Sequence, residues 1–134
     1  MKAWIVWMLA ACLPMAAVAE ESADGAAKVA YLTLSPPFVG NYGLDGSQKL
    51  KVYKADISLR VTGPEAAKAL KDNEPLIRNQ LVMLFAQQPS DGMSSVEAKE
   101  KLRQEALKQV QQVMTDETGK PVVEDLLFNN LIVQ

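Results

Sequence analysis

The sequence predicts an α+β domain in which a small antiparallel sheet packs with three helices. Two segments with strand character come first, three helical segments follow, and an apolar strand ends the printed sequence, so the predicted order is ββαααβ. Strands and helices segregated in this way are typical of an α+β domain rather than of alternating βαβ units. The chain has no internal repeat and no low-complexity segment. We therefore expect a single antiparallel sheet.

The first strand segment covers residues 29–34 and meets Ser35-Pro36-Pro37. Two prolines exclude a central strand, because each removes a backbone N–H from the ladder. We therefore expect a short edge strand that turns into an extended arm, followed by a loop over residues 41–47.

The longest strand candidate runs over residues 49–62. Leu50 and Val52 break its alternation, which indicates either a bulge or a strand covered on both faces at its start. Beyond them the pattern is regular, and one face carries Tyr53, Ala55, Ile57, Leu59 and Val61.

Three helices are predicted from their start signals and apolar spacing. Gly63-Pro64-Glu65 places proline at the first helical position and an acid in the first turn, and Pro75 restarts the chain. The second helix repeats apolar residues at helical spacing, namely Ile77, Leu81, Leu84 and Phe85. Ser94 and Glu97 form a candidate capping box for a third helix that reaches about Met114. Its expected apolar stripe consists of Leu102, Ala106, Val110 and Val113.

The last segment, residues 122–134, is rich in Val, Leu, Ile and Phe up to the final position. Chain ends fray unless something holds them, so this segment is predicted to be a strand that completes the sheet. Leu127, Phe128, Leu131 and Val133 are the side chains expected to be buried by it.

The amino-terminal segment has the layout of an export signal. Lys2 is followed by an apolar run, and Ala17-Val18-Ala19 precedes an acidic pair, so we expect cleavage after Ala19. Lipidation of Cys12 and retention as an uncleaved anchor are the alternatives, and all three place the remainder outside the cytoplasm. The expected organisation is a signal over 1–19, a flexible leader over 20–28 and one extracytoplasmic domain over 29–134.

Composition argues against several classes of function. The net charge is −2, so no basic excess is available for nucleic acid. The chain has no histidine, and its one cysteine lies in the expected signal, which excludes Ser-His-Asp and Cys-His sites. The carboxylates lie in no recognisable motif and are expected to be solvated surface charges. We therefore expect a protein that is not an enzyme, with no cofactor, no metal and no small-molecule substrate.

Five segments in order carry a resemblance to a known family. They are Pro37-Phe38-Val39-Gly40-Asn41 after the apolar strand 31–34, the long strand 50–61, Pro75-Leu76-Ile77-Arg78-Asn79, Lys99-Glu100-Lys101-Leu102-Arg103-Gln104-Glu105, and the final strand 128–134. On these motifs the chain resembles the FliL family of flagellar basal body-associated proteins, over nearly all of the expected domain.

The resemblance implies a domain similar to the stomatin-like fold that lies in the periplasm, near the inner membrane or the basal body. It further implies self-association into a homo-oligomer and binding to the periplasmic part of a flagellar stator subunit of the MotB type, in support of motility. The alternative is a periplasmic peptide-binding or chaperone-like module unrelated to flagella, which would take up a peptide on the arm around Phe38.

Five residues are candidates for interaction: Pro37, Phe38, Val39, Arg78 and Arg103. Phe38 either folds back onto its own core or docks onto a neighbouring subunit. For Arg78 the two readings are an ion pair with Glu74 or Asp72 and a contact between subunits. Arg103 is either a helix-face charge or part of one of the two complementary patches that a ring of identical subunits needs.

Overall fold

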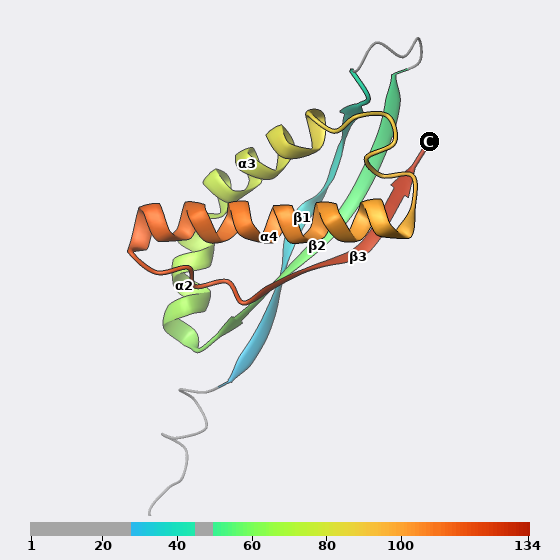
Figure 1. Cartoon of the computed structure of the whole chain (residues 1–134). Helices are drawn as coiled ribbons and strands as arrows, with labels where there is room; N and C mark the ends of the chain where they lie inside the picture. Colours follow the sequence, from blue (N-terminus) through green and yellow to red (C-terminus); the bar gives the residue numbers. More distant parts are fainter. Residues whose placement is uncertain (1–27, 45–49) are drawn as a thin grey trace, which may run out of the picture.

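The computed structural model describes residues 28–44 and 50–134 (Figure 1). The expected export signal and, apart from Lys28, the expected leader lie outside the described residues. The elements are β1 (Val29–Tyr42), β2 (Lys51–Thr62), α2 (Pro64–Asp72), α3 (Glu74–Ala86), α4 (Val96–Thr118) and β3 (Asp125–Val133). The α+β class and the order ββαααβ are thus confirmed.

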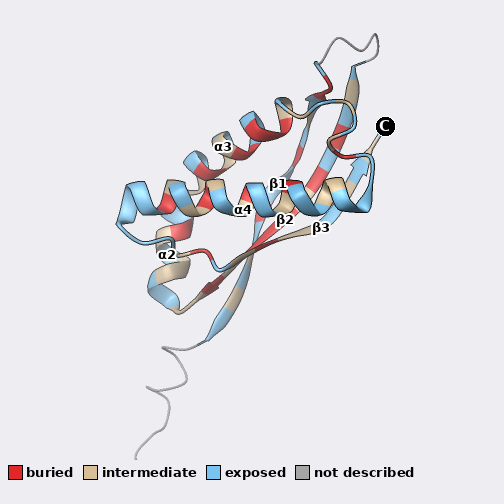
Figure 2. Cartoon of the chain, in the orientation of Figure 1, coloured by how far each residue is buried: buried red, intermediate tan, exposed pale blue. Residues whose placement is uncertain are grey.

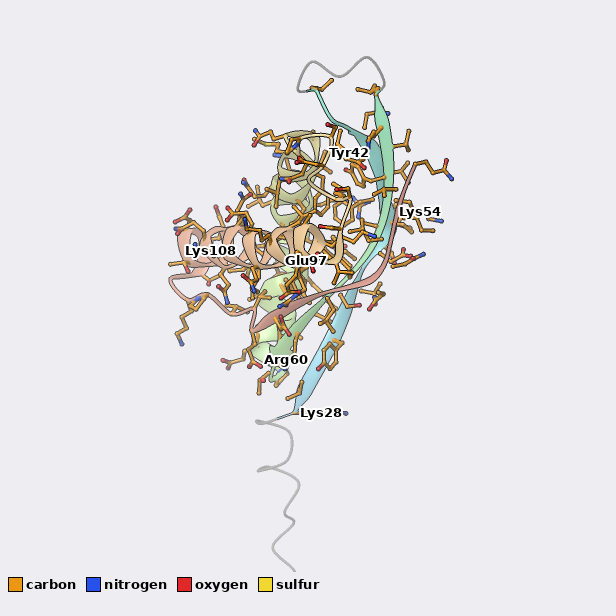
Figure 3. All side chains as sticks on the ribbon, turned by 45° about the vertical axis from the view of Figure 1, so that its right-hand side comes forward. Lys28, Tyr42, Lys54, Arg60, Glu97 and Lys108 are labelled. Atoms are coloured by element: carbon orange, nitrogen blue, oxygen red, sulfur yellow. The ribbon has the colours of Figure 1, made fainter. Side chains whose placement is uncertain are left out.

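The three strands form one antiparallel sheet in the order β1-β2-β3, with β2 in the centre. The helices lie on one face of this sheet, while no helix of residues 28–44 and 50–134 lies over the opposite face (Figures 1 and 3). We call this opposite face the open face. Lys54, labelled in Figure 3, lies on it.

The core lies between the sheet and the helices (Figure 2). The face of β2 predicted to be apolar is buried throughout, with Tyr53 2% exposed and Ala55, Ile57, Leu59 and Val61 fully covered. The expectation for the start of this strand is wrong, because Leu50 and Val52 are 54% and 42% exposed and the register there is regular. Val52 projects onto the open face, where none of the described helices covers it.

The expected arm after residue 34 is also wrong, because β1 continues to Tyr42. Leu34 pairs with Ile57 and Phe38 pairs with Ala55, so Ser35, Pro36 and Pro37 form a bulge between them. We call these three residues the proline bulge. Since β1 is an edge strand, it can carry prolines by bulging and then resume its pairing. The expected loop accordingly begins only at Gly43, and residues 45–49 of it lie outside the described residues.

The helices begin and end close to the predicted positions. In α3 the expected residues Ile77, Leu81, Leu84 and Phe85 are buried. The candidate cap at Ser94 is wrong by one residue, because the side chain of Ser95 accepts the hydrogen bond from the Ala98 N–H at 3.0 Å. α4 runs one turn further than expected, to Thr118, and is capped by Gly119, whose φ of 82° is a left-handed conformation that favours glycine. Its fourth buried residue is Met114 rather than Val113.

The final segment completes the sheet as β3, paired with β2 from Arg60↔Asp125 to Tyr53↔Val133. Its fully buried side chain is Leu126, and Phe128, Leu131 and Val133 pack partly buried against the core. Leu127 was expected to be buried with them, but it pairs with Ser58 on the open face, because its neighbour Leu126 points inward.

Candidate interaction site

Three of the five candidate residues meet where the proline bulge touches α3. The Arg78 guanidinium carbon lies 4.2 Å from the centre of the Phe38 ring, in a cation–π arrangement. Its Nη2 donates a hydrogen bond of 3.3 Å to the Pro37 carbonyl. Phe38 is only 1% exposed and meets Phe85 edge-on at a ring distance of 5.8 Å. The side chain of Phe38 therefore folds onto its own core, and Arg78 covers it.

Arg78 takes neither of the acidic partners expected for it from within the chain. The carboxylate of Asp72 pairs instead with Lys68, at 2.7 Å. The Nη1 atom of Arg78 is buried, and among the described residues it has no hydrogen-bond partner. Burial raises the pKa of the nearby Tyr53 phenol, and the positive charge of Arg78 opposes this rise. The Arg78 guanidinium thus binds to the Phe38 ring and the Pro37 carbonyl rather than to a carboxylate.

Val39 lies apart from this group, although it follows Phe38 directly. Successive side chains of a strand point to opposite faces, so Val39 projects from the open face and is 68% exposed. Its strand partner Lys54 separates it from Ile132 of β3, and Ile132 is 45% exposed. Val39, Val52 and Ile132 together make an apolar patch around Lys54, which we call the open-face patch.

Replacing Arg78 by methionine keeps most of the side-chain length and removes the charge and the donor. We expect the free energy of unfolding to fall by about 1–2 kcal/mol, since a desolvated cation–π contact and a hydrogen bond to a carbonyl are lost together. Urea denaturation measures the change. Lys101→Met, an exposed site on α4, is the control and should leave stability nearly unchanged. An equal effect of the two substitutions would contradict the role given to Arg78.

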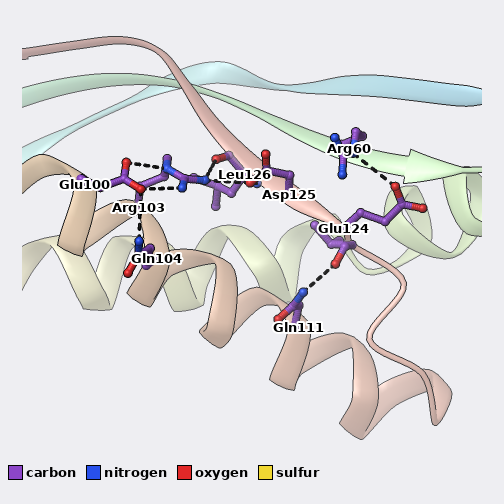
Figure 4. Close-up of polar contacts among 9 residues, drawn as sticks. Arg60, Glu100, Arg103, Gln104, Gln111, Glu124, Asp125 and Leu126 are labelled. Atoms are coloured by element: carbon purple, nitrogen blue, oxygen red, sulfur yellow. Dashed lines mark hydrogen bonds and ion pairs between the residues drawn. The ribbon is translucent and has the colours of Figure 1, made fainter.

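Arg103 holds the start of α4 to the start of β3 (Figure 4). Its Nη1 lies 2.7 Å from the Asp125 carboxylate and donates to the Leu126 carbonyl at 3.2 Å. Its Nε and Nη2 form a two-pronged pair with Glu100, at 2.8 and 2.6 Å. Hydrogen bonding to Arg103 lowers the pKa of the Glu100 carboxyl, and hydrogen bonding to Glu100 raises the pKa of Arg103. Within the described structure, Arg103 is therefore an intramolecular clamp between helix and sheet.

The lowered pKa of Glu100 makes part of the stability dependent on pH. A carboxyl whose pKa is lower in the folded state stabilises the fold above its ordinary pKa of 4.5 and loses this contribution as the pH falls through the folded value. We expect Glu100→Gln to be less stable than the unchanged chain at pH 7, and the difference to vanish in acid below the folded pKa. Thermal melts of both proteins from pH 7 to pH 3 measure it. A constant difference over this range would contradict the assignment.

Sequence reasoning selected Arg103 but missed its partners. Asp125 lies 22 residues further along the chain, and no local pattern connects the two. Arg60 and Glu124 were missed in the same way, and they form an ion pair of 3.2 Å beside this clamp (Figure 4). The acidic pair Glu124-Asp125 inside the otherwise apolar segment predicted over 122–134 is the one signal that could have pointed to cationic partners elsewhere in the chain.

The described residues offer little for chemistry. No group of three or more His, Cys, Asp or Glu residues among them could hold a metal ion. An open groove of about 690 Å³ runs beside α4, and its charged lining residues are Asp91, Lys101, Glu105 and Lys108. Opposite charges balance along this groove, and it is open to solvent rather than an enclosed cavity. In residues 28–44 and 50–134, no helix is both long and apolar enough to cross a membrane.

Comparison with known proteins decides the family. A family model described as "Flagellar basal body-associated protein FliL" matches residues 31–134, which include every element from the third residue of β1 to the last residue. The chain belongs to the FliL family. A search of curated proteins finds no match. FliL membership makes this chain a flagellar basal body-associated protein, and the family is one of structural flagellar proteins.

Arg78 and Arg103 both lie in segments that carry the resemblance to the FliL family. The Pro37-Phe38-Val39 and Pro75-x-Ile77-Arg78 motifs, which lie far apart in this FliL sequence, meet through the Arg78 guanidinium. The motif 99–105 and the final strand meet through Arg103. In this FliL chain, Arg78 therefore joins two of the five segments that carry the resemblance, and Arg103 joins a third to Asp125 and Leu126, which directly precede the last segment, 128–134.

Proposed function

We propose that this FliL protein is a non-enzymatic periplasmic component of the flagellar basal body, which self-associates and binds the periplasmic part of MotB-type stator units to support motility. Family membership is the observation that carries the proposal. The expected export signal supports a place outside the cytoplasm, near the inner membrane. The balanced groove and the composition, which lacks histidine, favour a scaffold over an enzyme.

The open face is the surface we assign to partner binding. It bears the open-face patch, whereas the helix-covered face is occupied by the protein's own core. Apolar side chains gathered at one end of an uncovered sheet are typical of an interaction surface. The candidate residues Pro37, Phe38, Arg78 and Arg103 act in this proposal by holding the sheet and helices in shape, and Val39 is the one that would touch a partner.

The alternative function, peptide capture on an extended arm around Phe38, loses its structural basis. Phe38 is 1% exposed, and β1 is paired with β2 on both sides of the proline bulge. No free arm exists among the described residues for a peptide to bind.

Two exposed valines provide a matched test of the partner surface. Val39→Asp places a charge in the open-face patch, and Val96→Asp places the same charge at the start of α4, where Val96 is 80% exposed. Each full-length variant, with a tag inserted after Ala19, is expressed in a strain that lacks the protein. We expect Val39→Asp to reduce both the stator protein recovered with the tag and the swimming halo, and Val96→Asp to preserve both. Equal recovery and motility would contradict the assignment.

A further inference from the structure

The two edges of the sheet differ in how well they are protected. β1 carries two successive prolines and a bulge at its centre, which are devices that discourage another strand from pairing. The other edge is formed by β3, whose residues after Asp125 include no proline and no charge. An edge of this kind is open to strand addition.

The backbone groups that β3 directs outward can be identified at both ends. Val52 and Gln134 exchange both backbone hydrogen bonds, so by alternation Leu131 and Val133 direct their N–H and C=O groups away from β2. At the other end, the Leu126 carbonyl accepts from Arg103 and its N–H donates to the Asp125 carboxylate. Leu126 therefore also faces outward, and Phe128 follows by alternation.

The edge is occupied at its start and free beyond it. Arg103 and Asp125 satisfy Leu126, and within the described part of the chain no hydrogen bond reaches the outward groups of Phe128, Leu131 and Val133. These residues form a row of unpaired donors and acceptors, which we call the free edge. It lies beside the exposed residues Asn129, Asn130 and Ile132.

The sequence of this strand is self-complementary about its middle. When two copies run antiparallel with Asn129 opposite the partner's Asn130, Phe128 lies opposite the partner's Leu131, and Leu127 opposite the partner's Ile132. Apolar residues then face apolar residues and amides face amides. Because this stretch carries no charge, two copies approach without repulsion.

The bulge in β3 makes this pairing consistent in space. A two-fold axis perpendicular to a sheet leaves each side chain on its own face, so opposed residues must share a face. The register shift at Asp56/Ile57 adds one residue, Asn129, to β3. It places Phe128 and Leu131 on the core face and Leu127 and Ile132 on the open face. Without the extra residue, each of these pairs would be split between the two faces.

We propose that the free edge of β3 pairs with the same edge of a second copy of this chain, antiparallel about Asn129 and Asn130, to give one continuous sheet of six strands. The outward N–H and C=O groups of Phe128 then form hydrogen bonds with those of the partner's Leu131. By symmetry, the outward groups of Leu131 bond to those of the partner's Phe128. Arg103 already occupies Leu126 and limits the pairing to the residues beyond it. This proposal rests on the self-association proposed above and names its surface.

Disulfide trapping tests the register directly. Leu127 and the partner's Ile132 form a pair without hydrogen bonds between them, whose Cβ atoms are expected about 4.5–5.5 Å apart, close to disulfide geometry. Two full-length proteins with different tags, Leu127→Cys and Ile132→Cys, are mixed and mildly oxidised, and both also carry Cys12→Ser. We expect a mixed disulfide. Each protein alone should form no disulfide between its own copies, because the two copies of position 127, or of position 132, lie about 17 Å apart along the paired strands.

A pair of charge variants tests the same contact without oxidation. Ile132→Glu combined with Leu127→Lys places opposite charges across the interface, and Ile132→Glu combined with Leu127→Glu places like charges there. We expect the like-charged protein to self-associate about tenfold or more weakly than the oppositely charged one, by sedimentation at matched ionic strength. Similar thermal melts of dilute samples show that both proteins are folded.

The outcomes separate this proposal from the function it rests on. An unchanged chain that sediments as a monomer at every concentration overturns self-association altogether. A second outcome is that the protein self-associates, but no mixed disulfide forms and the two charge variants self-associate equally strongly. This outcome overturns only the proposal that the free edge is the surface of self-association. A third outcome concerns hydrogen exchange at the Leu131 amide. If its protection depends on added membrane extract and not on protein concentration, the free edge pairs with a strand of another protein, and the proposal of a second copy is overturned.

Discussion

Deleting residues 128–134 is expected to unfold the domain. The deletion removes most of β3, leaves the N–H and C=O groups along one side of β2 unpaired, and strips Phe128, Leu131 and Val133 from the core. Burial of one such side chain contributes about 1.5–3 kcal/mol when complete, against a whole-domain stability of about 5–15 kcal/mol. Circular dichroism should show no cooperative melting transition in the truncated protein.

Ile132→Thr is the matched control for this deletion, because it changes β3 on the open face and leaves the core face and the ladder intact. It should melt as a folded domain. A truncated protein that melts like the full chain would contradict the core role of these residues and move them to a partner interface. A carboxyl-terminal fusion carries a related risk, since Gln134 itself bonds to Val52.

Phe85→Ala is the single substitution for which we expect the largest loss. The Phe85 ring is fully buried at the centre of an aromatic cluster, 5.8 Å from Phe38, 5.2 Å from Tyr53 and 6.2 Å from Phe128. It therefore joins all three strands to α3. Removing a buried phenylalanine costs about 3–5 kcal/mol, because apolar surface is lost and a cavity remains.

Urea denaturation measures this loss against Met83→Ala, which truncates a 47% exposed residue of the same helix. The control should change stability by no more than about 0.5 kcal/mol. Phe85→Leu keeps most of the volume and should fall between the two. A Phe85→Ala protein as stable as the control would mean that the aromatic cluster does not hold the layers together.

The central part of the fold could be predicted because its signals are local. Alternation along β2 identified the buried face, and the spacing of Ile77, Leu81 and Leu84 identified the buried face of α3. A capping serine could be located only to within one residue, since Ser94 and Ser95 both precede the helix. Propensity does not distinguish between them, and the geometry of the backbone does.

The features that the sequence does not predict are those in which the conformation of one strand depends on a neighbouring element. Two prolines after Leu34 predict the end of a strand, but whether they end it or only form a bulge depends on the position of β1 at the edge of the sheet. The bulge in β3 cannot be read from its own residues, because it is defined by the register against Asp56 and Ile57. The partners of Arg78 and Arg103 are equally non-local, lying 41 and 22 residues away.

Two adjacent prolines in β1 also limit how many copies can add to the sheet when the local concentration of the protein is high. A sheet with two receptive edges can add copies at both sides and extend into a fibre, as in cross-β aggregates. Here one side lacks two consecutive N–H donors, so strand pairing can proceed at the other side only. In the pairing proposed above, strand addition through the sheet therefore stops at two molecules and does not continue into a fibre.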